Sequence, residues 1–120
     1  FEDWNGTTGH EILIQVTDSD FVKLQMDMYW VVHSGKTPKE LVDQHPGRYT
    51  MWHIKDMDKI TRDYSELGNG SIDYVKILPD SEKSGLEYYY IEQGGNFKYN
   101  SMKSAATSAK FFKKNLQNLI

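Results

Sequence analysis

The sequence predicts an α/β fold built around a small parallel sheet. Apolar, strand-like runs alternate with segments of helical pattern along all 120 residues, which is the order of elements that βα units produce. The chain is 38% hydrophobic and 26% charged, as folded globular domains are, and this excludes a disordered or collagen-like chain. No repeat or linker divides it, so we expect a single unit over residues 1–120.

Three runs are typical of buried parallel strands. They cover residues 21–27, 49–54 and 87–92. The first becomes wholly apolar and aromatic around Asp27, and the third is rich in tyrosines, which favour strands. Consecutive parallel strands need a crossover connection, so a helix is expected after each strand, with a right-handed crossover.

Capping and stop signals predict four helices. They are expected near residues 9–17, 37–44, 71–85 and 100–116, and residues 55–70 are expected to form a polar loop. Thr37 followed by Pro38 is a strong helix start, and Pro79 is expected to interrupt or kink the third helix. The last helix is expected to carry one apolar stripe, formed by Ala105, Ala109, Phe112 and Leu116.

Composition excludes several classes of function. The formal net charge of −3 with scattered Lys and Arg gives no electrostatic footprint for nucleic acid. No apolar run approaches the roughly 20 residues that span a bilayer, so a soluble protein is expected. The absence of cysteine excludes disulfides and thiolate metal sites, and leaves the cytoplasm and the periplasm equally open.

Three strands are too few to close a barrel, and a parallel sheet this small leaves unpaired edges. The chain begins at Phe1 with neither an initiator Met nor a signal peptide. We therefore expect a fragment that lies against the missing strands, supplied by a severed N-terminal half or by a second copy of the chain.

Three residues at the expected strand ends form a candidate metal site. Asp27, His53 and Glu92 would arrive at one edge from successive strands, and their oxygen and nitrogen atoms suit Mn²⁺, Mg²⁺, Co²⁺ or Zn²⁺ without choosing among them. The ordinary alternative is that each carboxylate caps a helix or forms a salt bridge and that the histidine is merely hydrogen-bonded.

Five short motifs occur in an order and spacing that resemble a known barrel family. They are Asp27-Met28-Tyr29-Trp30, Pro46-Gly47-Arg48, His53-Ile54-Lys55-Asp56, Gly68-Asn69-Gly70 and Ile91-Glu92-Gln93. Together they resemble the xylose isomerase-like TIM-barrel family, often called sugar phosphate isomerase/epimerase. The resemblance implies a (β/α)8 barrel of which this chain is the C-terminal half, covering about the last three βα units, strands six to eight.

The resemblance also implies site roles. It makes Asp27, His53 and Glu92 the ligands of a divalent metal ion, with a fourth ligand before Phe1, and makes Glu92 the group that moves a proton next to a carbonyl. Apart from the resemblance, Lys55 follows His53 at the strand end and is expected to touch substrate. Trp30 and Tyr29 are expected to line a sugar ring with their aromatic faces, and a place in the barrel core is the alternative for both. Gly94 stands where an acidic residue often follows the Glu-Gln pair, a departure that would alter the substrate.

The function expected from these residues is a metal-dependent isomerase or epimerase acting on a sugar or keto-sugar. A keto-sugar or inosose lyase or dehydratase begins with the same proton abstraction and stays open. The third hypothesis is a barrel that only binds carbohydrate. The presence of all three metal-ligand residues argues against it. Cleavage of abasic DNA would need more histidine ligands and a basic groove, and the sequence has neither.

Overall fold

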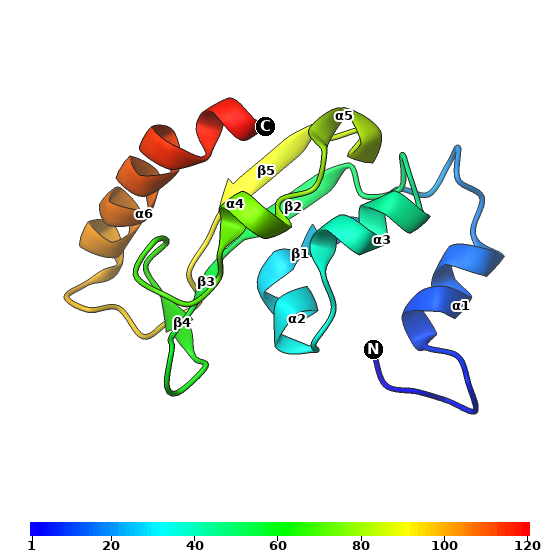
Figure 1. Cartoon of the computed structure of the whole chain (residues 1–120), viewed down its shortest axis with the longest axis horizontal. Helices are drawn as coiled ribbons and strands as arrows, with labels where there is room; N and C mark the ends of the chain where they lie inside the picture. Colours follow the sequence, from blue (N-terminus) through cyan, green and yellow to red (C-terminus); the bar gives the residue numbers. More distant parts are fainter.

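A computed structural model describes all 120 residues and has a three-stranded parallel sheet at its centre (Figure 1). Its strands are β1 (Gln25–Asp27), β2 (Met51–Ile54) and β5 (Tyr88–Ile91), in the order β1-β2-β5. Both neighbouring pairs are parallel, which confirms the predicted direction of all three strands. Each strand begins one to four residues later than expected, because only the segments that reach a neighbour form ladder hydrogen bonds.

The connections differ from the expected single helix after each strand. β1 is followed by two helices, α2 (Met28–His33) and α3 (Pro38–Gln44). β2 is followed by an antiparallel hairpin of β3 (Asp56–Met57) and β4 (Tyr64–Ser65), then by the short helices α4 (Tyr74–Ile77) and α5 (Ser81–Ser84). Only β5 leads to one long helix, α6 (Ser101–Asn115), which ends in the 3₁₀ turn η1 (Gln117–Leu119).

The helices begin where their capping residues predict. α1 (Gly9–Val16) starts with a capping box, in which Glu11 N donates to Thr8 Oγ1 (3.1 Å) and Thr8 N donates to a Glu11 carboxylate oxygen (2.7 Å). Asn100 caps α6 by accepting a hydrogen bond from Lys103 N at 3.0 Å. Pro79 lies between α4 and α5, so the expected interruption divides that segment into two short helices.

The expected polar loop at residues 55–70 was wrong in part, since it contains the β3–β4 hairpin. Asp58 organises the turn by accepting hydrogen bonds from Ile60 N (2.9 Å) and Thr61 N (2.8 Å), and Arg62 adopts a positive φ of 61°. Each strand of this hairpin has two residues, which is too short to show the alternation that reveals a strand in a sequence.

The core lies between the sheet and the helices of one face. Trp52 and Ile54 of β2 are completely buried, and the Trp52 indole N–H lies 3.1 Å from both Tyr49 O and Ser84 Oγ. α6 contributes Phe112, and Leu116 follows directly after its last residue, both as expected. The other members of this cluster are Met26, Met28, Val31, Leu41, Val42, Tyr49, Leu67 and Tyr74.

The expected alanine stripe of α6 was wrong at two positions. Ser104 and Ser108 are the buried residues there, whereas Ala105 is exposed and Ala109 is partly buried. The serines are buried because their hydroxyls have partners, Glu66 for the first and Leu67 N for the second. A partner on a distant segment is not visible in the helical pattern.

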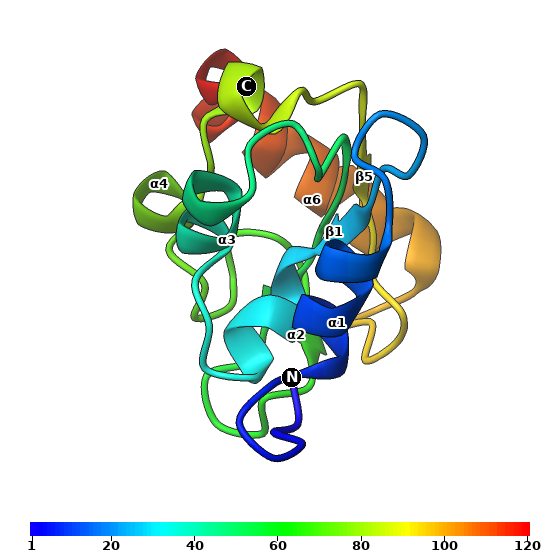
Figure 2. The ribbon, with the colours of Figure 1, turned by 90° about the vertical axis from the view of Figure 1, so that its right-hand side faces the viewer.

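Both flanks of the sheet expose apolar and aromatic side chains. Tyr88, Tyr89 and Tyr90 of β5 are 60%, 40% and 47% exposed. On the β1 side of the molecule, α2 packs against β1, α1 faces the viewer in Figure 2, and α1 exposes Leu13 and Val16. No helix of the protein combines the length and the apolar character that crossing a membrane requires.

Candidate metal and substrate site

Asp27, His53 and Glu92 meet at the C-terminal end of the parallel sheet. The register places Asp27 beside His53, and Glu92 N donates to Ile54 O at 3.1 Å just beyond the end of β5. One possible ligand atom from each side chain lies within 4.8 Å of the others. Three separate strands supply these residues, so the shared register of the sheet brings them together.

The imidazole of His53 lies between the two carboxylates. Its Nδ1 is 2.7 Å from Glu92 Oε2, within hydrogen-bonding distance, and 3.8 Å from Asp27 Oδ2. Ligands of one ion, each about 2.0–2.3 Å from it, lie roughly 3–4 Å from one another. The Asp27–His53 pair has this spacing, whereas Glu92 and His53 are joined by a direct hydrogen bond.

Lys55, two residues after His53, contacts both carboxylates of the same cluster. Its Nζ lies 2.8 Å from Asp27 Oδ2 and 3.0 Å from Glu92 Oε2, and its side chain is 9% exposed. Burial alone lowers the pKa of this ammonium, but hydrogen bonds to the two carboxylates outweigh burial and raise the pKa overall. The buried Tyr74 hydroxyl fixes the Lys55 backbone, accepting from its N–H and donating to its carbonyl oxygen.

Glu92 is the most exposed member of the cluster, at 44% of its side chain. The hydrogen bond from Lys55 is the main cause that lowers the pKa of its carboxyl below the ordinary value of 4.5, with smaller contributions from the charges of Lys55 and His53. At neutral pH Glu92 is therefore an ionised carboxylate that reaches solvent while two cationic or polar neighbours hold it.

Gln25 is a site residue that the sequence reasoning missed. Its Nε2 lies 2.7 Å from His53 Nε2, the ring nitrogen that faces away from the carboxylates. A partner on that nitrogen orients the ring and selects the tautomer. The sequence did carry a signal, because Gln25 precedes Asp27 by two residues on one strand and so lies on the same face of the sheet.

The two aromatic residues expected to line a sugar differ in exposure: Trp30 reaches solvent, whereas Tyr29 is buried. Trp30 is 49% exposed, its backbone N–H donates to Asp27 Oδ1 at 3.2 Å, and it lines a cavity of about 200 Å³ together with Asp27 and Gln25. Tyr29 is 3% exposed, and its hydroxyl donates to Arg62 O at 2.7 Å. Tyr29 thus supports the wall of the site, packing edge-on against Trp30 with ring centres 4.9 Å apart.

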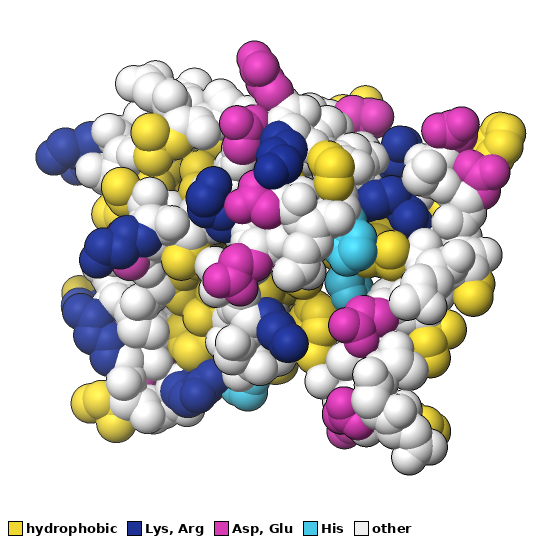
Figure 3. Space-filling view, turned by 45° about the vertical axis from the view of Figure 1, so that its right-hand side comes forward, with side chains coloured by type: hydrophobic (Ala, Val, Ile, Leu, Met, Phe, Trp, Pro, Cys, Tyr) yellow, Lys and Arg dark blue, Asp and Glu magenta, His cyan; other side chains and the backbone are white.

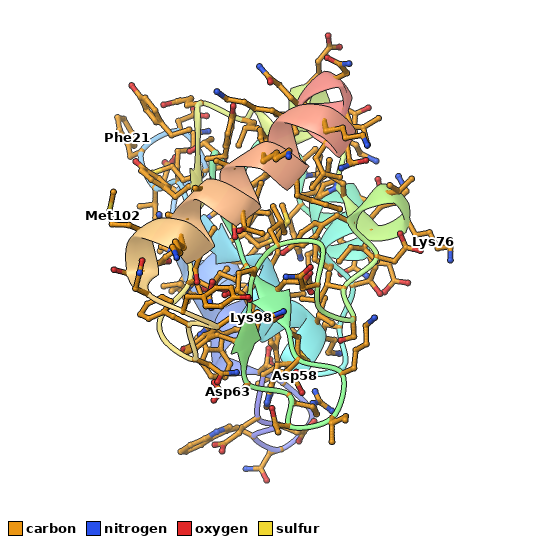
Figure 4. The ribbon with its side chains drawn as sticks, turned by 90° about the vertical axis from the view of Figure 1, so that its left-hand side faces the viewer. Phe21, Asp58, Asp63, Lys76, Lys98 and Met102 are labelled. Carbon is orange, nitrogen blue, oxygen red and sulfur yellow. The ribbon has the colours of Figure 1, made fainter.

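The hairpin after β2 is fastened to the segment that follows Glu92. Glu66, only 6% exposed, accepts hydrogen bonds from Lys98 N (3.0 Å) and Ser104 Oγ (2.6 Å). In Figure 4, Asp58 and Asp63 mark the turn of this hairpin, and Lys98 lies beside it on the segment leading into α6. This contact holds together the two segments that carry Lys55 and Glu92.

A second recess lies between α1 and α3. It is lined by His10, His45 and Glu40 among others and encloses about 90 Å³. Figure 3 shows histidine side chains within a recess bordered by acidic and hydrophobic groups. Burial, followed by the nearby His45, lowers the pKa of His10, whose Nε2 lies 2.7 Å from the Tyr49 hydroxyl. The carboxylates of this recess do not converge with the histidines on one point, so the recess offers no set of metal ligands comparable with Asp27, His53 and Glu92.

Comparison with known proteins gives a similarity in fold. No family model matches the chain, and no curated protein matches it. Among solved structures it is similar to sugar phosphate isomerase/epimerase proteins, which confirms the resemblance inferred from the five motifs.

Two of these structures come from Parabacteroides distasonis. The first, a sugar phosphate isomerase/epimerase, is 26% identical over 93% of this chain with a TM-score of 0.76. The second has the same description, is 23% identical over 91% of the chain with a TM-score of 0.73, and supports the fold alone. In both cases the chain spans 37% of the length of the solved protein.

Proposed function

We propose that this chain forms part of the active site of a metal-dependent isomerase or epimerase that removes a proton next to the carbonyl of a sugar or keto-sugar. The observation that carries the proposal is the meeting of Asp27, His53 and Glu92 at one end of three parallel strands. The similarity to solved sugar phosphate isomerase/epimerase proteins supports the class of substrate.

The chemistry of the three donors fits a divalent ion. Two carboxylates and one imidazole form a mixed oxygen and nitrogen set that suits Mn²⁺, Mg²⁺, Co²⁺ or Zn²⁺. Asp27, His53 Nδ1 and Glu92 would hold it, with the imidazole proton on Nε2 and the Gln25 amide turned so that its carbonyl oxygen accepts from that N–H. When bound, such an ion supplies a Lewis acid that polarises the substrate carbonyl.

Glu92 is the residue of this chain that fits the role of base. It is ionised at neutral pH because its pKa is lowered, and its exposed carboxylate can meet a substrate that enters from solvent. Lys55 lies within 3.0 Å of the same carboxylate and carries a positive charge that can offset negative charge developing on a substrate oxygen. Trp30 offers a half-exposed aromatic face for the C–H surface of a sugar ring.

The remaining strands of a (β/α)8 barrel would complete this site. The outer edges of β1 and β5 have no partner strand in the chain, and the tyrosines of β5 are partly exposed. The chain also spans only 37% of the solved proteins it is similar to. An N-terminal half or a second copy would pair with these edges and supply the fourth ligand.

The proposal is tested by exchange of the α-proton with solvent. The full-length protein is incubated in D₂O with Mn²⁺ and D-fructose, D-tagatose or their 6-phosphates, and deuterium incorporation is followed by NMR. Glu92→Gln keeps the size of the side chain but removes the base, so exchange should fall by a factor on the order of 10³ or more.

The matched control is Glu87→Gln at the opposite, N-terminal side of β5, where the carboxylate is exposed and far from the cluster. This variant should keep the wild-type rate. Unchanged exchange in Glu92→Gln would remove Glu92 from the mechanism. Appearance of a dehydrated product in place of an epimer would assign the protein to the lyase class instead.

A further inference from the structure

Tyr64 of the β3–β4 hairpin borders the charged cluster, although it lies in a segment that the sequence suggested was a loop. Lys55 Nζ lies over its ring, 5.9 Å from the centroid. The ring also packs against Tyr29, with centroids 5.0 Å apart and planes tilted by 35°. Tyr64 therefore lies between the segment that follows β1 and the end of β2, next to both carboxylate contacts of Lys55.

The hydroxyl of Tyr64 has no hydrogen-bond partner in the protein. The backbone of this residue is fully used, since its N–H donates to Asp63 Oδ1 at 2.7 Å and its carbonyl accepts from Asn96 Nδ2 at 2.8 Å. The backbone is thus held in place, while the side chain is only partly buried. A phenol fixed in this way presents one donor and one acceptor to whatever occupies the mouth of the site.

Gly94 lets the Tyr64 ring lie against the backbone just beyond Glu92. A Cβ atom on Gly94 would lie 2.9 Å from Tyr64 Cε2 and 3.0 Å from Cζ, closer than carbon atoms normally approach. A Cβ on the neighbouring Gly95 would lie 3.9 Å from Tyr64 Cδ2, an ordinary contact. The ring therefore occupies the space that a side chain at position 94 would fill.

We propose that Tyr64 is a specificity-determining residue of this site, whose ring forms one wall of the sugar pocket and whose hydroxyl binds a substrate hydroxyl. Gly94 is a positioning residue that keeps the ring in place. The inference rests on the proposed function, because it gives Tyr64 a role in binding the sugar substrate of that same site. An aromatic face packs against the C–H surface of a sugar, and a neutral phenol hydrogen-bonds to a hydroxyl.

The first test is Tyr64→Phe in the full-length protein, assayed by α-proton exchange with D-fructose, D-tagatose and their 6-phosphates. The change removes only the hydroxyl. We expect KM for the best of these sugars to rise about 5- to 10-fold, with kcat within about twofold of wild type, because a uniform binding contact is lost. Tyr99→Phe, on an exposed tyrosine without contact to the cluster, should leave KM unchanged.

The second test measures the coupling between the glycine and the ring. Gly94→Ala should raise KM by displacing Tyr64, whereas Gly95→Ala should not, because its added methyl makes only an ordinary contact. In a Tyr64→Ala background, where the ring is gone, Gly94→Ala should add little. A double-mutant cycle on KM should therefore be clearly non-additive.

The outcomes separate this inference from the proposed function. If the wild-type protein exchanges the α-proton and Tyr64→Phe keeps the wild-type KM, or if the cycle is additive, the assignment of Tyr64 is wrong and the proposed function stands. If the wild-type protein exchanges no proton of any sugar in the panel, both fail together.

Discussion

Lys55 has two kinds of carboxylate as neighbours, Asp56 beside it in the chain and Asp27 and Glu92 at its ammonium group, and their hydrogen bonds are satisfied in opposite ways. Asp56 is 1% exposed, and backbone N–H groups alone satisfy it. The four donors are Met57 N (2.8 Å), Gly68 N (2.8 Å), Gly70 N (3.1 Å) and Ile72 N (3.1 Å). The side chains of Asp27 and Glu92, in contrast, are 23% and 44% exposed and are held mainly by the side chains of Lys55 and His53.

The contrast separates a structural carboxylate from a group available for chemistry. Every oxygen of Asp56 is used to fix the path of residues 66–72, and its backbone partners cannot leave without unfolding that loop. Apart from the Trp30 N–H on Asp27, the partners of Asp27 and Glu92 are side chains, which can change rotamer without unfolding a loop. A ligand can therefore replace them at the cluster but not at Asp56.

The largest expected loss of stability comes from removing the Asp56 carboxylate, which holds the loop at residues 66–72. Asp56→Ala should lower the free energy of unfolding by about 3 kcal/mol or more, because four buried or partly buried backbone N–H groups lose this acceptor. Urea denaturation measures this loss. Asp43→Ala, at an exposed surface pair with Lys83, should cost less than about 1 kcal/mol. Equal losses at the two positions would show that the Asp56 loop is not an anchor.

An intermediate effect is expected at Lys55. Lys55→Met should cost about 1 kcal/mol of stability, since the two carboxylates are partly exposed and can be hydrated again. The same variant should bind Mn²⁺ more tightly, because a cation no longer occupies the carboxylate oxygens. Calorimetric titration with Mn²⁺ checks the second part. Lys76→Met, at an exposed pair with Asp73, is the control, and weaker Mn²⁺ binding by Lys55→Met would contradict the expectation.

The smallest effect concerns the pH dependence of Glu92. Its folded pKa lies below the ordinary value of 4.5, so the stability that this shift contributes is present above pH 4.5 and is lost as the pH falls through the folded pKa. Glu92→Gln should remove this part of the acid dependence. The difference should stay below about 1 kcal/mol, because the side chain is 44% exposed and screened by solvent. Urea titrations at pH 7 and pH 3 on both proteins measure it, and an identical pH dependence would show that Lys55 does not stabilise this carboxylate.

The sequence was sufficient for the parts of the molecule that depend on local pattern. The three strands were visible as apolar runs, and helix starts such as Thr37-Pro38 and Asn100 were visible as capping residues. The meeting of Asp27, His53 and Glu92 followed once the strands were parallel, because their C-terminal ends share one edge. Whether these residues hold a metal ion stays a prediction.

The parts that were missed depend on contacts between distant segments. The burial of Ser104 requires Glu66, which is 38 residues earlier, and Tyr64 becomes a site residue only because Gly94 lies beneath its ring. Neither relation leaves a periodic pattern. The β3–β4 hairpin was missed because each of its strands has only two residues. Its turn is fixed by the side chain of Asp58 rather than by a glycine pair.

The alternation of side chains along β2 makes the site sensitive to chain length in one short stretch. Trp52 and Ile54 are fully buried, whereas Met51 and His53 between them are partly exposed. Insertion of one residue between Trp52 and His53 would break this alternation: if Trp52 stays buried, the imidazole turns into the core and away from Asp27, and if His53 keeps its place, the Trp52 indole turns out to solvent. Insertions in the connections at residues 34–37 or 58–63 would leave this phase intact. The connections at residues 34–37 and 58–63 can therefore vary in length while Asp27, His53 and Glu92 keep their arrangement.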